Sequence, residues 1–231
     1  MNKNILLFGE YGSGKTELAL NLAACLAAEG PVDFFDMDGT KPVFRSRAQT
    51  PGDDRVVMHR AETLLDAPVI PPGADAAIRN EQRCCIFDIG GSVPGARMAA
   101  QLAPALQMCG YEAYLVVNPY RPFCNTAESL GHTLDLIGNA ADLQWSGIIG
   151  NPGYGSATTA EDVEAGCRQV LAMASECGVP VAALTATQEV KERVSPAFAG
   201  QLTVIRRILS NPWNNLYYSS EKERADGLYN N

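Results

Sequence analysis

The segment Ile5–Thr16, with the sequence ILLFGEYGSGKT, decides the fold of this chain. It places Gly9, Gly14, Lys15 and Thr16 in the spacing G-x-x-x-x-G-K-T, after an apolar run and before a helical one. In that context the spacing predicts a phosphate-binding loop between a strand and a helix, rather than a glycine turn that binds nothing. The glycines let backbone N–H groups point at phosphate oxygens, while the helix N-terminus and Lys15 add positive charge. We therefore expect the chain to bind a nucleoside phosphate.

The residues of this loop and of the first helical turn are the first candidate binding residues. Thr16 is placed to offer its hydroxyl to Mg²⁺, as the last residue of this motif does. The residues expected to surround the nucleotide are Gly9, Glu10, Tyr11, Gly12, Ser13, Gly14, Lys15, Thr16 and Glu17.

Composition narrows the class of protein. The chain has 231 residues, of which 46% are apolar, and a net charge of −8. That acidity argues against a non-specific nucleic-acid surface and against docking on anionic lipid. No apolar stretch is long enough to cross a bilayer, and the start does not read as a signal peptide, so we expect a cytoplasmic protein. We predict one domain over residues 1–210 and a C-terminal tail over 211–231.

Apolar runs alternate with helical patterns along the chain. This alternation predicts an α/β fold of three layers, a single P-loop domain whose mostly parallel central sheet has helices on both faces. The carboxyl ends of parallel strands then meet at one edge, where ligands bind. The predicted strands are Ile5–Phe8, Val32–Phe35, Val56–His59, Cys84–Phe87, Tyr114–Val117, Ile148–Ile149 and Val181–Leu184. The predicted helices are Lys15–Glu29, Arg97–Met108, Asn125–Ile137, Ala160–Cys177 and Pro196–Ser210.

Carboxylates follow two of these strands. The second strand ends in Asp36-Met37-Asp38, so its aspartates could act on Mg²⁺ and on an attacking water. A later strand ends at Asp88 and continues to Gly91 as D-x-x-G, where the aspartate of a P-loop enzyme holds the Mg²⁺ shell. The backbone N–H of Gly91 could then sense the terminal phosphate. The metal candidates are Thr16, Asp38 and Asp88; an ordinary Asx turn remains the alternative for Asp88.

Two further strands lead into polar loops. Asn118–Pro122 is stiffened by two prolines and carries Arg121 as its charge, which suits either a connector or a functional loop. Asn151 follows the next strand and could bond a purine edge or simply begin a turn. The guanine-reading tetrapeptide N-K-x-D does not occur in the sequence, which favours adenine. We therefore expect ATP with Mg²⁺.

Taken in order, these blocks resemble the SIMIBI class of P-loop NTPases, which includes the MinD and ParA ATPases, the nitrogenase iron protein and CobQ/CobB-type synthetases. The chain looks most like MinD/ParA-like ATP-binding proteins, through Gly12–Glu17, Asp36–Asp38 with Phe44–Arg47, Asp88–Gly91 and Asn118–Pro122. The resemblance implies that Lys15 and Thr16 take the phosphates and Mg²⁺. It also implies that Asp38 orients the hydrolytic water and that Asn151 contacts adenine.

One position departs from the resemblance. MinD, ParA and the nitrogenase iron protein carry a signature lysine where this chain has Glu10. A carboxylate cannot stabilise negative charge on the terminal phosphate, so another cation must replace the lysine or hydrolysis must be slow. The natural substitutes are Lys41, Arg45 and Arg47, and we favour Arg45 because a guanidinium can engage a phosphate bidentately. Surface ion pairs are the alternative role for all three.

The sequence thus predicts a Mg²⁺-dependent ATP-binding protein and slow ATP hydrolase, with Lys15, Asp38 and Arg45 as catalytic residues. We expect it to serve as a nucleotide switch or energy supplier for an unidentified protein partner, in metalloenzyme maturation or electron transfer, and to form a homodimer as many SIMIBI proteins do. The alternative is an ATP-dependent kinase or synthetase of the dethiobiotin-synthetase or CobQ kind, with Tyr120, Arg121 and residues 151–156 building an acceptor pocket. A nucleotide-sensing scaffold without catalysis is a third possibility.

Overall fold

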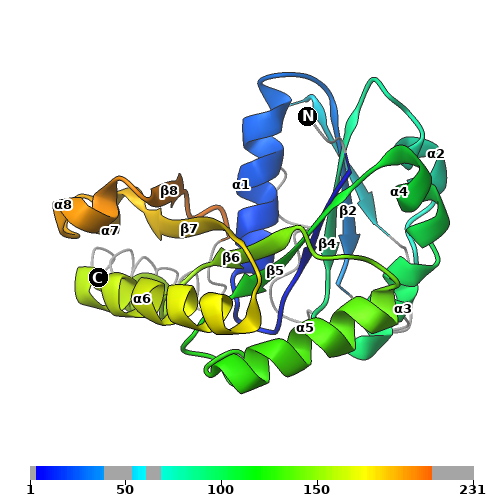
Figure 1. Cartoon of the computed structure of the whole chain (residues 1–231). Helices are drawn as coiled ribbons and strands as arrows, with labels where there is room; N and C mark the ends of the chain where they lie inside the picture. Colours follow the sequence, from blue (N-terminus) through cyan, green and yellow to red (C-terminus); the bar gives the residue numbers. More distant parts are fainter. Residues whose placement is uncertain (1–3, 39–53, 61–68, 210–231) are drawn as a thin grey trace, which may run out of the picture.

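The computed structural model describes residues 4–38, 54–60 and 69–209 (Figure 1). The first half of the chain contains β1 (Asn4–Phe8), α1 (Lys15–Ala27), β2 (Val32–Met37), β3 (Val56–Arg60), α2 (Ala74–Ile78), β4 (Cys84–Ile89), α3 (Val93–Ala100) and α4 (Ala103–Cys109). The second half contains β5 (Glu112–Val117), α5 (Ala127–Ala141), β6 (Gly147–Gly150), the 3-10 turn η2 (Gly155–Ala157), α6 (Ala160–Cys177), β7 (Val181–Thr187), α7 (Gln188–Lys191), α8 (Pro196–Ala199) and β8 (Leu202–Ile205).

The eight strands in the described part of the chain form one sheet in the order β3-β2-β4-β1-β5-β6-β7-β8. Every ladder between them is parallel, so the predicted α/β fold with a mostly parallel sheet is confirmed. β1 lies between β4 and β5 at the centre. The register places Asp88 of β4 opposite Leu7 of β1 and opposite Asp36 of β2. The carboxyl ends of β2, β4 and β5 therefore lie around the loop that follows β1.

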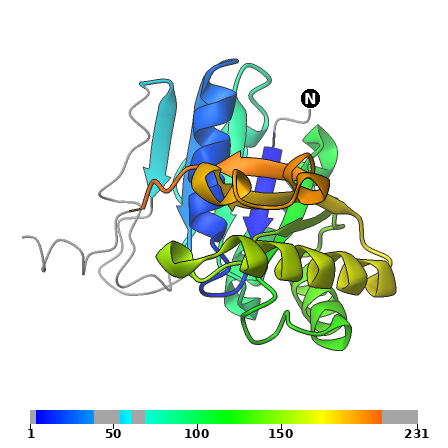
Figure 2. The same cartoon turned by 90° about the vertical axis from the view of Figure 1, so that its left-hand side faces the viewer.

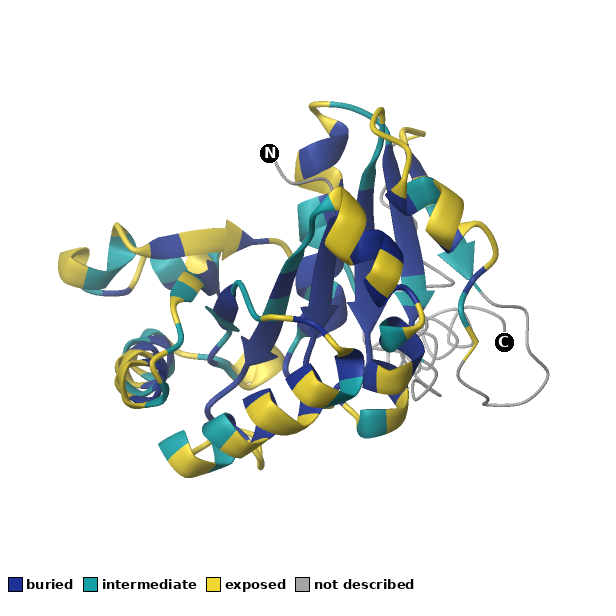
Figure 3. Ribbon diagram, turned by 45° about the vertical axis from the view of Figure 1, so that its right-hand side comes forward, coloured by how far each residue is buried: buried dark blue, intermediate teal, exposed yellow. Residues whose placement is uncertain are grey.

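Alternation along β1 divides the core into two layers. Ile5 and Leu7 pack with the buried side of α1, whereas Leu6 and Phe8 pack with α3, α4 and α5 on the other face. Figure 3 shows the buried central strands between helices whose outer surfaces are exposed. In Figure 2, α7 and β8 (orange) cross in front of α1 (blue) at one end of the sheet. The two apolar faces of the sheet explain why helices cover both of them.

Two predicted helices are wrong in extent. The predicted helix Arg97–Met108 is split into α3 and α4, because Pro104 lies in the first turn of α4 and lacks the N–H that a continuous helix needs. The predicted helix Pro196–Ser210 is reduced to the four residues of α8 and is followed by the strand β8. β8 contains Thr203, Val204 and Ile205, whose β-branched side chains favour a strand.

The other predicted strands and helices all occur, with ends shifted by a few residues. The predicted tail 211–231 lies outside the described residues, as does residue 210. Across the part of the chain that the structure describes, no helix is both long and apolar enough to span a bilayer.

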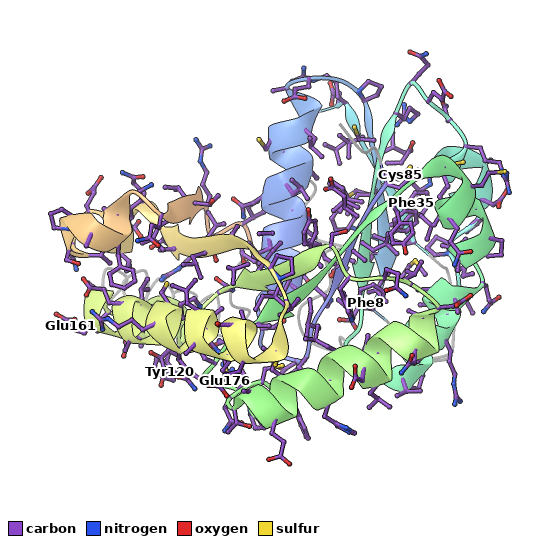
Figure 4. All side chains as sticks on the ribbon, viewed as in Figure 1. Phe8, Phe35, Cys85, Tyr120, Glu161 and Glu176 are labelled. Atoms are coloured by element: carbon purple, nitrogen blue, oxygen red, sulfur yellow. The ribbon has the colours of Figure 1, made fainter. Side chains whose placement is uncertain are left out.

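The aromatic contact between β2 and β4 should be a main source of stability. Phe87 is fully buried and stacks on Phe35 with ring centroids 4.8 Å apart; Figure 4 shows Phe35 and Phe8 within the core. We expect Phe87→Ala to lower the free energy of unfolding by about 3–5 kcal/mol, because it removes apolar contacts and leaves a cavity. Denaturant unfolding measures this, with Leu136→Ala on the exposed side of α5 as the control. Equal stability of the two variants would contradict this account of the core.

Candidate functional site

The loop between β1 and α1, residues 9–14, is the predicted phosphate-binding loop. Gly12 and Gly14 adopt left-handed conformations with φ of 79° and 85°, which side chains disfavour. The Ser13 N–H donates to the carbonyl of Glu10 at 3.0 Å and closes the turn. α1 begins directly at Lys15, so its first N–H groups lie at the end of this loop. The predicted glycine motif is thus a bent loop at a helix N-terminus.

Lys15 is the charged centre of the site. Its side chain is buried, and its Nζ lies 2.6 Å from Asp88 Oδ1 and 2.9 Å from Asp38 Oδ2. Burial alone would lower the pKa of Lys15, but attraction to the two carboxylates outweighs it and raises the pKa. The ammonium therefore stays charged across the physiological range. Lys15, Asp38 and Asp88 come from three separate segments of the chain. The sequence predicted that they share one site, and the structure brings them into contact.

Thr16 adds a hydroxyl oxygen to the carboxylate oxygens of Asp38 and Asp88 that could bind a metal ion. Its hydroxyl donates to Asp88 Oδ2 at 2.8 Å, so Asp88 contacts both residues that follow Gly14. A hydroxyl and two carboxylates fit Mg²⁺, which is usually bound through one or two carboxylates together with phosphate oxygens. Among the described residues no group of three or more His, Cys, Asp and Glu could hold a metal by itself. The donor set therefore suits a metal that arrives with a phosphate ligand.

The loop after β4 packs directly on the phosphate-binding loop. A Cβ built on Gly91 would lie 2.4 Å from the carbonyl carbon of Gly9 and 2.6 Å from the N of Glu10. Asp38 lies close to the loop after β4, because its Oδ1 is 3.0 Å from a Cβ built on Gly90. The Gly91 backbone thus lies beside the first residues of the loop, and its phosphate-sensing role stays a prediction.

Two asparagines hold the carbonyls of the phosphate-binding loop. Asn151, after β6, donates from Nδ2 to the Ser13 carbonyl at 2.8 Å and accepts at Oδ1 from the Thr185 hydroxyl at 2.8 Å. Asn118, after β5, donates to the Gly12 carbonyl at 3.4 Å and to the Gly153 carbonyl at 2.8 Å. Sequence reasoning missed this role of Asn118. The sequence does show that β5 and β6 are each followed by Asn-Pro, but this repeat does not name the carbonyl that Asn118 bonds.

Glu17 contacts the far end of the described chain. Its carboxylate accepts hydrogen bonds from the backbone N–H groups of Ile208 and Leu209. Burial raises the pKa of Glu17, and these two N–H groups oppose that rise. One turn later, Asn21 donates to the Arg206 carbonyl at 2.8 Å and accepts from the Arg206 N–H at 2.7 Å. The contact of Glu17 with nucleotide stays a prediction, whereas its bonding to residues 208 and 209 is a role that the sequence did not indicate.

The remaining candidates differ in how far the structure places them. Glu10 is partly buried, and burial raises the pKa of its carboxyl. Tyr11 is exposed at the tip of the loop, with 75% of its surface accessible. Arg45, together with Lys41 and Arg47, lies outside the described residues.

Comparison with known proteins identifies the fold. No family model and no curated protein matches this chain. Solved structures of FtsY do match. Those from Mycoplasma mycoides and Thermotoga maritima are each 18% identical to it, with TM-scores of 0.54 and 0.53. The chloroplast FtsY of Physcomitrella patens is 16% identical, with a TM-score of 0.50.

These matches cover 81%, 80% and 80% of this chain but only 61%, 62% and 59% of the FtsY chains, so this chain spans about three fifths of their length. At this level of identity the likeness establishes the fold. The chain shares the α/β fold of these FtsY structures, which is the fold of a P-loop NTPase.

The close approach of Gly91 to the phosphate-binding loop gives a direct test of the packing. We expect Gly91→Ala to lower the free energy of unfolding by about 1–3 kcal/mol, because the new methyl group would overlap the backbone of Gly9 and Glu10. Gly200→Ala is the matched control, since nothing lies within 4 Å of a Cβ there. Thermal or denaturant unfolding of the two variants decides between them, and a Gly91 variant as stable as the control would contradict this close contact of the two loops.

Proposed function

We propose that this protein binds ATP with Mg²⁺ and hydrolyses it slowly, as a nucleotide switch or energy supplier for a protein partner. The observation that supports this most directly is the buried contact of Lys15 with Asp38 and Asp88, with Thr16 on the same Asp88 carboxylate. A glycine-rich loop, one lysine and one hydroxyl then stand beside two carboxylates from neighbouring strands. These are the kinds of group that phosphoryl transfer to water requires.

The reaction follows from the positions of these groups. The N–H groups of the loop and Lys15 would bind the phosphate oxygens, while Thr16, Asp88 and Asp38 would hold Mg²⁺. When bound, Mg²⁺ neutralises charge on the phosphates. Asp38 orients a water molecule, whose oxygen forms a bond to the terminal phosphorus as the bond to the bridging oxygen breaks. The electron pair stays on ADP, and a proton of the water passes to the released phosphate.

The same contacts supply a switch. With phosphate and Mg²⁺ in the site, Lys15 and the two carboxylates gain competing partners of opposite charge, so the Lys15 ion pairs loosen. Asp38 bonds Lys15 and also lies close to Gly90, which follows β4. Loosening the ion pair between Lys15 and Asp38 would therefore affect the ends of β2 and β4 together. Two loops at the ligand edge would therefore differ between nucleotide states. Such loops are a suitable surface for a partner or for a second copy of the chain.

The choice of ATP rests on the sequence. The likeness to FtsY shows the fold alone and gives no ground for choosing between adenine and guanine nucleotides. The chain lacks the N-K-x-D tetrapeptide that reads guanine. One N–H of the Asn151 amide is bonded to Ser13, and Nδ2 carries a second that could donate to a base. Competition of ATP and GTP for the purified protein is the test, and tighter binding of GTP would overturn this choice.

The partner, the homodimer and the MinD/ParA-like role are extensions of this proposal, supported by the resemblance of the motifs. The kinase or synthetase alternative is less favoured by the structure. Tyr120 donates its hydroxyl to the Asp162 carbonyl of α6, and its ring stacks on Tyr154 at 4.6 Å (Figure 4 places Tyr120 beside α6). These two rings pack against each other and are therefore poor candidates for an acceptor pocket.

Removal of the Lys15 ammonium tests nucleotide binding. We expect Lys15→Ala to weaken ATP binding by at least about tenfold, because a charge-assisted bond to phosphate contributes roughly 1.5–3 kcal/mol. Titration with a fluorescent ATP analogue in Mg²⁺ measures the affinity. Lys191→Ala, which removes a lysine that donates to the Leu202 carbonyl at the start of β8, serves as the control. Unchanged affinity in a folded Lys15→Ala protein would refute the binding proposal.

Asp38 tests the catalytic step separately. We expect Asp38→Asn to keep ATP binding within about threefold and to reduce turnover by roughly 10²-fold or more, because the amide cannot hold the water as a carboxylate does. Phosphate release assays measure turnover, with Asp135→Asn on the exposed side of α5 as control. Lost ATP binding would instead show that Asp38 acts chiefly by holding Mg²⁺ or the loop and not by orienting the water, and unchanged turnover would remove it from the mechanism.

A further inference from the structure

Arg121 lies against the phosphate-binding loop, on the segment that joins β5 to α5. Its Nε donates to the Gly12 carbonyl at 3.4 Å. A Cβ built on Gly12 would lie 2.9 Å from Nε and 3.2 Å from Cζ of Arg121. The guanidinium therefore occupies the space beside Gly12 that a side chain would need. The G-x-x-x-x-G-K-T pattern allows any residue at position 12. Two features explain why it is a glycine here, the contact with Arg121 and the left-handed backbone.

The loop that carries Arg121 is held on the same carbonyl. The Arg121 N–H donates to the Asn118 carbonyl at 3.0 Å, and Asn118 Oδ1 accepts from the Tyr120 N–H at 3.1 Å. The Asn118 amide donates in turn to Gly12. Prolines at 119 and 122 further restrict this backbone. Arg121 therefore extends from a rigid turn that is docked on the loop it contacts, so its reach is fixed.

The charge of Arg121 is available to a ligand. Lys15 is engaged by the carboxylates of Asp38 and Asp88, and Glu10 places a further carboxylate on the phosphate-binding loop itself. Arg121 is exposed, and the contact with Gly12 is its one side-chain hydrogen bond within the described residues. A guanidinium has five N–H donors, so most of them remain for an anion. A triphosphate that enters this carboxylate-rich site needs such a cation near its outer end.

We propose that Arg121 is a catalytic residue that contacts the terminal phosphate of the bound nucleotide, within the same chain. This inference rests on the proposed function and assigns the cation that the site needs in addition to Lys15. The planar guanidinium can bind two phosphate oxygens at once. It would stabilise the negative charge that spreads over those oxygens as the bond to the bridging oxygen breaks. Arg121 would thereby supply the charge that Glu10 cannot, and Arg45 would not be required.

Three variants of the full chain test this role. Arg121→Gln keeps an N–H donor for the Gly12 carbonyl but removes the charge, Arg121→Lys keeps the charge without the planar fork, and Arg193→Gln is the control at an exposed arginine. Affinities for ATP and for ADP, each with Mg²⁺, and turnover of ATP are measured. We expect Arg121→Gln to bind ADP within about twofold of wild type and ATP about tenfold more weakly, because one charged phosphate contact is lost. Turnover should fall by roughly 10²-fold or more, with partial recovery in Arg121→Lys.

The outcomes separate the two proposals. If Lys15→Ala leaves ATP affinity unchanged, the nucleotide function itself is wrong. If Lys15→Ala abolishes binding while Arg121→Gln matches Arg193→Gln in ATP affinity and turnover, the function stands and the role of Arg121 is overturned. If Arg121→Gln weakens ADP and ATP equally, Arg121 acts by shaping the loop and does not contact the terminal phosphate. Since the ratio of ATP to ADP affinity needs no turnover, the test also decides for a very slow enzyme.

Discussion

The structure depends on one constraint, that the carbonyls of the loop after β1 must bind protein groups so that its N–H groups remain for an anion. The loop satisfies the Glu10 carbonyl with its own Ser13 N–H, but the carbonyls of Gly12 and Ser13 take donors from outside it. Neighbouring strands supply the donors, since Asn118 and Arg121 hold Gly12 and Asn151 holds Ser13. The sheet order, with β1 between β4 and β5, brings these loops within reach. The fold therefore serves to hold one short loop in a shape that it would not keep alone.

Charge is arranged around this loop in opposed pairs. The buried Lys15 ammonium would be costly without its two carboxylates, and the carboxylates would be costly without it. Such a cluster is stable without a ligand, but its ion pairs would rearrange when a charged ligand competes for the lysine or the carboxylates. Glu10 and Arg121 add a further carboxylate and a further cation beside the same loop. A protein with a net charge of −8 can in this way present a local site for a polyanion.

Much of this arrangement follows from local sequence. The motif at Gly9–Thr16 and the apolar run that ends at Asp88 are short-range patterns, so the P-loop, its strand and the neighbouring carboxylate strand were predictable. The strand β8 was not predictable. Leu202–Ile205 is too short to show an alternation of apolar and polar residues, and it follows a segment with a helix-like pattern. The bonds of Asn118 and Glu17 were not predictable either. They join residues 106 and at least 191 positions apart, and only the tertiary fold brings these together.

The bonds of Glu17 and Asn21 to residues 206–209 have a consequence for how the protein is made. α1 leaves the ribosome well before these backbone partners, which are among the final residues of the described chain. Contacts of this sequence separation raise the entropic cost of closing the chain and slow folding. The helix behind the phosphate-binding loop thus acquires its full set of bonds only after residues 206–209 have been made. A nascent chain therefore lacks these bonds to α1 until residues 206–209 have emerged from the ribosome.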